Sequence, residues 1–460
     1  MYPRDTIAAV ATPTAKGAIG IIRISGPDAL TILGRIFKGK TFNKLSPTPR
    51  HLYSGCILDT DDNTVVDSVL ATYMKSPGTY TGEDVVEVHC HGGLTVIDKI
   101  LSLMTSWGAR PAEPGEFTKR AFINGRMDLT QAESVIDIID SGTVAALKLA
   151  AKQHQGILYE HLKRIRRELL DIRSSLEVAI DFPEDENEIL SPEAVVAKSQ
   201  RIIDDLTALI NSYEQGRFYR NGVSAAIIGK PNVGKSSLLN AILQDNRAIV
   251  TATPGTTRDI IRESINVKGF PVHFLDTAGI TKSADDIEQI GVERSYAAIE
   301  DSDLLILVLD GSREPDNRDK YIISRIPLDK SLVAINKSDL PQCPETESFC
   351  DEYAFLKKIS ISALEHHGID MLIQSIYDFI NGSGEDPAAA MLLTNLRHKN
   401  LLEKTGAALH SVIHAVTSGH SAELITVDLQ SALDAIGEIT GETATDDILN
   451  TIFNNFCIGK

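Results

Sequence analysis

A short segment in the middle of the chain has the residue types and spacing needed to bind nucleotide phosphates. Residues 229–237 read Gly-Lys-Pro-Asn-Val-Gly-Lys-Ser-Ser, between an apolar β-branched run and a helical pattern. A glycine, four residues and then Gly-Lys-Ser, between a strand and a helix, is the P-loop arrangement. Gly229 and Gly234 turn backbone N–H groups towards phosphate oxygens, where a helix N-terminus also favours negative charge. Lys235 then reaches the β- and γ-phosphates, and the Ser236 hydroxyl binds Mg²⁺.

Three further motifs specify the nucleotide and its base. Residues 276–279 (Asp-Thr-Ala-Gly) match the DxxG element that senses the γ-phosphate, and residues 336–339 (Asn-Lys-Ser-Asp) match NKxD. The Asp339 carboxylate accepts both guanine N–H donors, which adenine does not offer, so the motif favours GTP over ATP. Residues 362–364 resemble the loop that lies behind the base. The GTP-binding residues predicted from these motifs are Asn232, Val233, Gly234, Lys235, Ser236, Ser237, Asp276, Thr277, Ala278, Gly279, Asn336, Lys337, Ser338, Asp339, Ser362, Ala363 and Leu364.

The elements that must position these motifs form a P-loop GTPase domain, predicted over residues 220–381. Apolar strands alternate there with helices, which indicates a mostly parallel, doubly wound sheet. The strands are expected at 223–228, 272–275, 304–309, 332–336 and 358–361. A Gly- and Ser-containing linker at 381–387 closes the domain.

The remaining chain is predicted to form two more domains. Residues 1–118 mix strand and helix signals and indicate an α+β domain, whereas 119–219 and 382–460 are helical and form one discontinuous domain. In the first, strands are expected at 7–11, 18–24, 65–74 and 85–89, and helices at 27–37 and 94–107. In the second, helices are expected at 130–141, 143–180, 192–219, 392–416, 422–440 and 446–453.

Composition limits the partners. A net charge of −18 excludes indiscriminate nucleic-acid binding, so any RNA contact needs a local basic patch or a partner protein. Lys163, Arg164, Arg166 and Arg167 form such a patch, or simply a solvated helix face. The five cysteines contain no CxxC pair, no apolar run reaches about 18 residues, and the N-terminus lacks a signal core. We expect a cytoplasmic protein with no membrane contact.

One departure from the usual pattern concerns catalysis. Ras-type enzymes have a glutamine just after DxxG that orients the attacking water, but this chain has Ile280, which neither donates nor accepts. Another group must orient water and offset the developing charge. In this departure, and in motifs along its whole length, the chain resembles the MnmE (also TrmE) family of tRNA-modifying GTPases. The motifs that carry the resemblance are 229–237, Gly-Thr-Thr-Arg-Asp at 255–259, 276–279, Phe-Cys-Ile-Gly-Lys at 456–460, Arg-Ile-Ser-Gly at 23–26, Thr-Gly-Glu-Asp at 81–84 and Asn-Gly-Arg-Met-Asp-Leu at 124–129.

The resemblance implies a potassium ion in place of an arginine finger, with nucleotide domains dimerising across it. Asn232 would be the side-chain ligand, or only a turn former; an amide oxygen suits a hard cation, which offsets charge at the phosphates. The family's catalytic glutamate maps to Glu288, and the magnesium threonine to Thr257, beside Ser236. The loop supplying the remaining GTP contacts is Thr251, Ala252, Thr253, Pro254, Gly255, Thr256 and Thr257, of which Thr251, Thr253 and Thr256 are the further potassium ligands.

The resemblance also implies a tetrahydrofolate site, for a 5-formyl or 5,10-methylene derivative, in a dimerising N-terminal domain. The residues carried over are Arg23, Glu83, Arg126 and Lys460. Arg126 stands where the family pattern leads us to expect lysine, so a planar guanidinium replaces a compact ammonium group. Cys457 is assigned to the active centre, as a nucleophile or else as a small buried hydrophobe.

The function implied by the resemblance is GTP hydrolysis coupled to C5, carboxymethylaminomethyl-type modification of the wobble uridine in certain tRNAs. The implied assembly is a homodimer acting with the FAD-containing protein MnmG in a heterotetramer-type complex. Two alternatives remain open at this point. One is a ribosome-assembly or regulatory GTPase that modifies nothing, and the other is a folate-dependent enzyme with a vestigial GTPase.

Overall fold

The computed structural model describes residues 5–13, 15–181, 190–245, 262–275, 302–355, 357–381 and 393–460. The chain divides into two compact units, each assembled from separated segments. Unit 1 comprises Met1–Ile136, Gln153–Ser191 and Ser418–Lys460, and unit 2 comprises Asp137–Lys152 and Pro192–Thr417. The three-domain division at 1–118, 119–219 with 382–460, and 220–381 stays a prediction.

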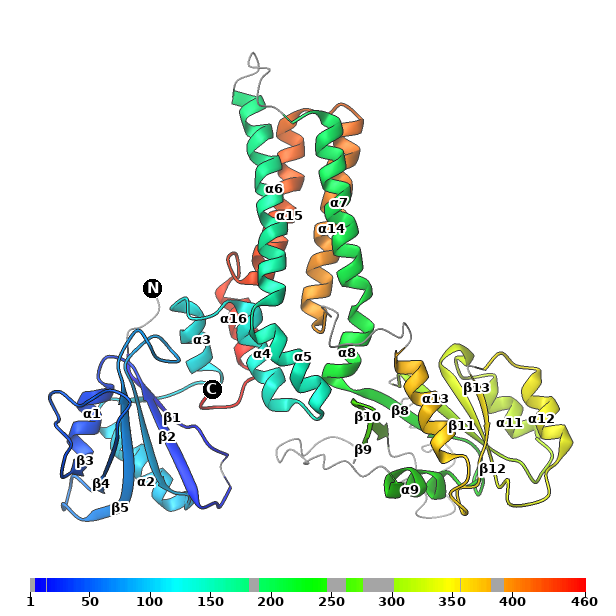
Figure 1. Cartoon of the computed structure of the whole chain (residues 1–460), viewed down its shortest axis with the longest axis horizontal. Helices are drawn as coiled ribbons and strands as arrows, with labels where there is room; N and C mark the ends of the chain where they lie inside the picture. Colours follow the sequence, from blue (N-terminus) through cyan, green and yellow to red (C-terminus); the bar gives the residue numbers. More distant parts are fainter. Residues whose placement is uncertain are drawn as a thin grey trace. The chain divides into compact units, whose positions relative to one another are not determined.

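Unit 1 contains a seven-stranded sheet whose strand order is β3-β4-β5-β6-β2-β1-β7. Figure 1 labels β1 to β5 of this sheet. The strands are β1 (Ile7–Val10), β2 (Ile19–Ser25), β3 (Phe37–Gly39), β4 (Leu52–Leu58), β5 (Val65–Met74), β6 (Val85–His91) and β7 (Arg110–Pro111). Pairing is antiparallel except between β1 and β7. Four of these strands were predicted; β3, β4 and β7 were not.

Alternation along β2 decides which side chains face the core of this sheet. Ile22 and Ile24 are fully buried and pack with residues of α1 (Ala29–Ile36) and α2 (Leu94–Ser106). Because successive strand residues point to opposite faces, Arg23 lies on the face away from that core. This alternation places a charged side chain on a sheet whose other face is sealed by two helices.

Helices complete unit 1. The long α6 (Ile157–Asp181) packs along α15 (Ala422–Thr440), and α16 (Asp446–Phe453) packs against α3 (Glu116–Ile123). The start of α4 (Leu129–Asp140) joins the C-terminal residues in a small apolar cluster. That cluster comprises Leu129, Ala132, Leu449, Phe453 and Phe456.

Unit 2 is built on a six-stranded sheet of order β13-β12-β11-β8-β10-β9. Its strands are β8 (Val223–Ile228), β9 (Arg262–Val267), β10 (Phe270–Leu275), β11 (Leu304–Asp310), β12 (Ser331–Asn336) and β13 (Lys357–Ser360). All pairs are parallel except β9 with β10, which confirms the mostly parallel prediction and adds an antiparallel edge. The helices that follow these strands are α9 (Lys235–Asp245), α11 (Asn317–Ile323), α12 (Pro344–Asp351) and α13 (Ile369–Asn381), with a 3₁₀ turn at Leu328–Lys330.

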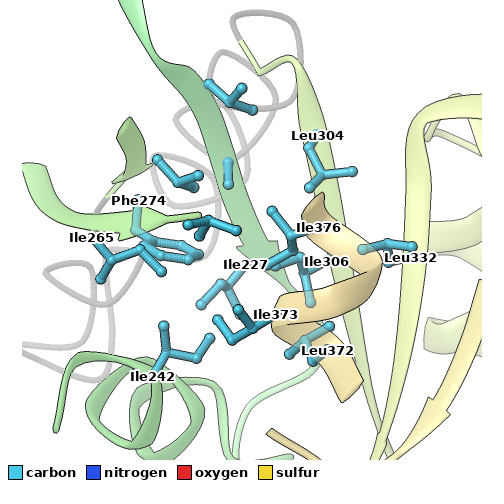
Figure 2. Close-up of a cluster of buried hydrophobic side chains, with 14 of the residues drawn as sticks. Ile227, Ile242, Ile265, Phe274, Leu304, Ile306, Leu332, Leu372, Ile373 and Ile376 are labelled. Atoms are coloured by element: carbon cyan, nitrogen blue, oxygen red, sulfur yellow. The ribbon is translucent and has the colours of Figure 1, made fainter. Parts of the chain in front are cut away.

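The core on one side of this sheet is mostly aliphatic. Figure 2 shows Ile227 of β8 and Ile306 of β11 beside Ile373 and Ile376 of α13, with Ile242 of α9 in the same cluster. These side chains are buried, and removing a large one from such a core costs about 2–5 kcal/mol. The core therefore holds the strands whose carboxyl ends carry the nucleotide motifs.

Two predicted helices are each interrupted. Residues 143–180 form α5 (Val144–His154) and α6, because Gly156 has φ +83°, a left-handed conformation that does not continue a helix. Residues 192–219 form α7 (Pro192–Asn211) and α8 (Tyr213–Asn221), with the Ser212 hydroxyl donating to the Leu209 carbonyl at the break. In unit 2, α7 packs along α14 (Leu396–Thr417). Among the described residues, no helix is long and apolar enough to span a bilayer.

Candidate functional site

The P-loop of unit 2 connects β8 to α9 through two glycines with left-handed backbone. Gly229 has φ +145° and Gly234 has φ +101°. A Cβ on Gly229 would collide with the Val308 carbonyl oxygen, and one on Gly234 with the Asn336 amide. Asn232 is also left-handed, at φ +64°, which asparagine tolerates better than most residues. The loop thus curves closely around the space in front of the α9 N-terminus.

Lys235, the first residue of α9, folds back over this loop. Its Nζ donates to the carbonyl oxygens of Gly229 and Lys230, each at 2.8 Å. Burial lowers the pKa of Lys235, because desolvation disfavours the charged ammonium. Ser236 and Ser237 follow in the first turn of α9 and are exposed. An anion at this position would both restore the lysine charge and meet the helix N-terminus.

Asn336, at the end of β12, joins the P-loop to the predicted base-binding loop. Its Nδ2 donates to the Val233 carbonyl at 2.8 Å, and its Oδ1 accepts from the Ala363 N–H at 3.0 Å. The side chain is buried, so both bonds form away from water and position the two loops firmly. The asparagine of the NKxD motif therefore has a structural role. This role explains why the position needs an amide, which both donates and accepts a hydrogen bond.

The rest of the base-binding loop is organised around Asp339. The Ser362 hydroxyl donates to Asp339 Oδ1 at 2.5 Å, and the Ser338 N–H donates to the Ile361 carbonyl at 3.0 Å. Asp339 itself is exposed, with its carboxylate oriented by Ser362. An oriented, accessible carboxylate with two acceptor oxygens suits the paired N–H donors of guanine.

Lys337 is held by a carboxylate that the motif does not contain. Its Nζ donates to Oδ2 of Asp310, the last residue of β11, at 2.6 Å. Burial disfavours ionisation of Asp310, but hydrogen bonds from Lys337 and Ser312 outweigh it and lower its pKa. Asp310 was not predicted; its position beside Asn336 in the β11–β12 register is the signal that would have found it.

Part of the predicted nucleotide site lies outside the described residues. This applies to the loop of Thr251, Ala252, Thr253, Pro254, Gly255, Thr256 and Thr257, to Asp276, Thr277, Ala278 and Gly279, and to Glu288. The described part consists of the P-loop, the Asn336–Asp339 motif and the Ser362–Leu364 loop. These three follow β8, β12 and β13, so they meet at one edge of the sheet, where ligands of open α/β sheets bind.

A second candidate site lies around Arg23, on the face of the unit 1 sheet opposite α1 and α2. The guanidinium is 2.8 Å from Glu87 Oε1, directly across the β2–β6 ladder, and Nη1 donates to the Gly459 carbonyl at 3.4 Å. Its carbon lies over the rings of Tyr80 (5.9 Å) and Phe117 (5.7 Å). Aromatic faces beside a guanidinium form a surface that suits a flat, partly anionic ligand.

Glu83 contacts different partners. It accepts from the Ser25 hydroxyl at 2.7 Å and lies 3.2 Å from Arg120 Nη1. Arg120 is buried and also binds Asp5 and Glu116, with a 2.9 Å contact to the latter. Glu83 thus contacts Ser25, which lies on the same face of β2 as Arg23, but the carboxylate that contacts Arg23 is Glu87. The strand register is the signal that would have identified it.

The last residues of the chain belong to this same region. The Phe117 N–H donates to the Lys460 carbonyl at 3.1 Å, and Gly459 has φ +93° and packs against the Val10 carbonyl. Cys457 is exposed, so it is not a small buried hydrophobe. The Arg126 stem lies beside Gly82, next to Glu83. The structure therefore brings Arg23 and the C-terminal segment together, with Arg126 adjacent to the Glu83 turn.

Comparison with known proteins identifies the family. A family model described as the MnmE helical domain matches residues 129–457, and one described as the GTP-binding protein TrmE N-terminus matches residues 6–126. A protein of Carboxydothermus hydrogenoformans named tRNA modification GTPase MnmE is 45% identical over 99% of both chains. The chain belongs to the MnmE family. Relatives with the same name in Alkaliphilus metalliredigens and Geobacter metallireducens are 42% and 45% identical, over 100% of both chains.

Membership of the MnmE family agrees with the geometry of unit 2. The family consists of GTP hydrolases that take part in tRNA modification. The fold class predicted from the sequence pattern is confirmed, with an N-terminal α+β region, helical segments and a P-loop domain. The described P-loop and base-binding loops are compatible with GTP binding, and the other predicted contacts lie outside the described residues.

Proposed function

We propose that this chain is a potassium-dependent GTPase that works with a flavoprotein of the MnmG type to modify C5 of wobble uridine in certain tRNAs. It would act in the cytoplasm as a homodimer, and FAD would be carried by the partner. A tetrahydrofolate derivative would bind unit 1. Family membership supports the tRNA and GTPase parts, and the residues described below support the ligands.

The observation that carries the GTPase proposal is the double hydrogen bond of Asn336. It fixes the P-loop carbonyl of Val233 and the Ala363 N–H in one arrangement. A guanine bound at Asp339 and phosphates bound at Gly234 and Lys235 would therefore be held by one preorganised unit. Preorganisation reduces the free energy that binding must spend on ordering loops.

The P-loop residues have the chemistry required for both metal ions. Ser236 offers an exposed hydroxyl at the start of α9, suitable for Mg²⁺ together with Thr257. Asn232 offers an exposed amide oxygen on the loop, suitable for K⁺ together with Thr251, Thr253 and Thr256. When bound, a cation there offsets negative charge that develops on the phosphates during hydrolysis. Glu288 would orient the attacking water.

In unit 1 we propose that Arg23, Arg126 and Lys460 supply positive charge to the tetrahydrofolate. The carboxylate that reads the pterin is proposed to be Glu87 as well as, or instead of, Glu83. Glu87 contacts Arg23, whereas Glu83 is bound to Ser25 and Arg120. Cys457, exposed on the neighbouring C-terminal segment, is available as a nucleophile.

The cation requirement is tested by hydrolysis assays in K⁺ and Na⁺ at equal ionic strength. We expect hydrolysis at least tenfold faster in K⁺, and no K⁺ stimulation in the Asn232→Ala variant. Asn240→Ala is the matched control, because Asn240 is an exposed asparagine further along α9. Equal rates in the two salts would remove potassium from the mechanism.

The tRNA reaction is tested by nucleoside analysis. A deletion strain complemented with the wild-type chain should contain C5-modified wobble uridines, and one complemented with Lys235→Ala should lack them. Unaltered wobble uridines in the deletion strain itself would favour a regulatory GTPase. Full modification with Lys235→Ala would instead indicate that GTP hydrolysis is vestigial.

A further inference from the structure

Lys230, the first variable residue of the P-loop, is tied to a helix outside the nucleotide motifs. Its Nζ lies 2.6 Å from Oδ2 of Asp319 and 3.0 Å from Oδ2 of Asp316. Asp316 is the N-cap of α11, and Asp319 is the third residue of that helix. Each of the two carboxylates accepts a hydrogen bond from the other residue's backbone N–H group in a capping box. The carboxylates are therefore held in place independently of Lys230.

Burial distinguishes the two partners of Lys230. The Asp319 side chain is 3% exposed and that of Asp316 is 57% exposed. Asp319 Oδ1 has no hydrogen-bond partner among the described residues, so Lys230 supplies the main compensation for this buried charge. The two carboxylates therefore hold the Lys230 ammonium firmly.

The backbone of Lys230 connects this pair to the phosphate-binding lysine. The Lys230 carbonyl accepts from Lys235 Nζ at 2.8 Å, and Asn232 follows two residues later. Lys230 and Asn232 also line the same small cavity, together with Asp310 and Asp319. An ion pair at the start of the loop thus restrains the segment that carries one acceptor of Lys235 and leads to Asn232.

We propose that Lys230 and Asp319 are positioning residues that hold the P-loop in its nucleotide-binding conformation. They touch no predicted substrate atom and act through the loop backbone. Without the pair, the loop would have to be ordered by the nucleotide itself, so that affinity falls while bound GTP still reaches the same arrangement. The proposal rests on GTP binding at this P-loop.

The test compares Lys230→Met, Lys230→Arg and wild type in nucleotide titrations with a fluorescent GTP analogue. We expect the Kd to rise about tenfold in Lys230→Met, with kcat at saturating GTP within threefold of wild type. Lys230→Arg should restore Kd to within threefold, because its guanidinium can still pair with Asp319. Lys320→Met removes an exposed lysine from α11 and is the control, with Kd unchanged.

A second variant separates positioning from folding. Asp319→Asn keeps the capping geometry but removes the charge, so its Kd should rise like that of Lys230→Met, and the double variant should be no weaker than either. A Kd for Lys230→Met within twofold of wild type, or no rescue by arginine, would overturn the proposal. So would additive losses in the double variant. If wild type itself fails to bind GTP, the proposed function fails instead.

Discussion

The two candidate sites are built in opposite ways. The nucleotide site of unit 2 uses short runs of consecutive residues, placed at one sheet edge by β8, β12 and β13. The site around Arg23 in unit 1 uses single residues from distant segments, among them Glu87, Phe117 and Gly459. Local backbone geometry creates the first, whereas long-range pairing creates the second. Sequence motifs therefore describe one site far better than the other.

The two sites also differ in how deeply their polar and charged groups are buried. In unit 2 the residues expected to touch ligand, such as Ser236 and Asp339, are exposed and keep their polar groups available. In unit 1 the surroundings of Arg23 include the buried Arg120, which compensates Glu83 and Glu116. A buried charge network contributes to stability only while every member is present. Mutations of these exposed residues in unit 2 should thus affect function, whereas mutations within the buried Arg120 network of unit 1 should affect folding.

The strongest test of this contrast is Arg120→Met. Removing the guanidinium leaves buried Glu116 with less compensation, so the free energy of unfolding should fall by about 3–5 kcal/mol. Urea denaturation measures this change, and Lys40→Met, which removes an exposed lysine from the same unit, should cost less than about 0.5 kcal/mol. A loss below 1 kcal/mol for Arg120→Met would contradict the stabilising role given to the network.

A slightly smaller effect is expected for Asp339→Asn. The amide places a donor opposite guanine N–H donors, so GTP affinity should fall about 100-fold, or roughly 2.7 kcal/mol, without a change in thermal stability. Xanthosine triphosphate, which has a carbonyl where guanine has its amino group, should lose far less. Asp370→Asn, an exposed acid on α13, is the control for titration. Equal losses for both nucleotides would exclude direct base reading by Asp339.

The third test asks which carboxylate serves the folate site. Calorimetric titration with 5-formyltetrahydrofolate should show about tenfold weaker binding for Arg23→Met, or roughly 1.4 kcal/mol, and a similar loss for Glu87→Gln. Glu83→Gln should weaken binding less, because Glu83 is held by Ser25 and Arg120. The reverse order of the two glutamates would support the assignment made from the motif.

The smallest effect concerns acid stability. Burial disfavours ionised Glu116, but hydrogen bonds from Arg110, the Glu113 N–H and Arg120 outweigh it, and its pKa lies below the usual 4.5. A carboxyl whose pKa is lower in the folded state stabilises the fold above its unfolded pKa and loses that contribution as pH falls. Unfolding free energy should therefore decrease below about pH 4.5, and Glu116→Gln should flatten that part of the profile. An unchanged profile would argue against the network.

Sequence reasoning was most accurate where structure is dictated locally. β8, α15 and α16 begin and end where the apolar patterns predict, and the P-loop has the expected strand–loop–helix context. β10 was predicted, but β9 and the hairpin that joins the two strands were missed, although Lys268 and Gly269 both have positive φ, typical of a two-residue turn. The break at Gly156 was missed because a helical glycine and a terminating glycine look alike in sequence.

The site around Arg23 could be predicted only in part for a different reason. Alternation along β2 predicts the face of the sheet on which Arg23 lies. Only the register with β6 identifies Glu87 as its partner. That register depends on pairing between strands separated in the chain by one helix and three other strands. Likewise, nothing in the spacing of Lys230 and Asp319 indicates that the P-loop is tied to α11, since 88 residues and a sheet crossover separate them.

The contact between Arg23 and the Gly459 carbonyl spans 436 residues of chain. At a synthesis rate of about 5–20 residues per second, the arginine leaves the ribosome roughly 20–90 s before its last neighbour. During that interval the face of the nascent sheet that carries Arg23 is uncovered, because the C-terminal segment that later contacts it has not been synthesised. Chaperone binding, or a pause in translation beyond unit 2, would therefore change the yield of native protein by acting on this half-assembled species.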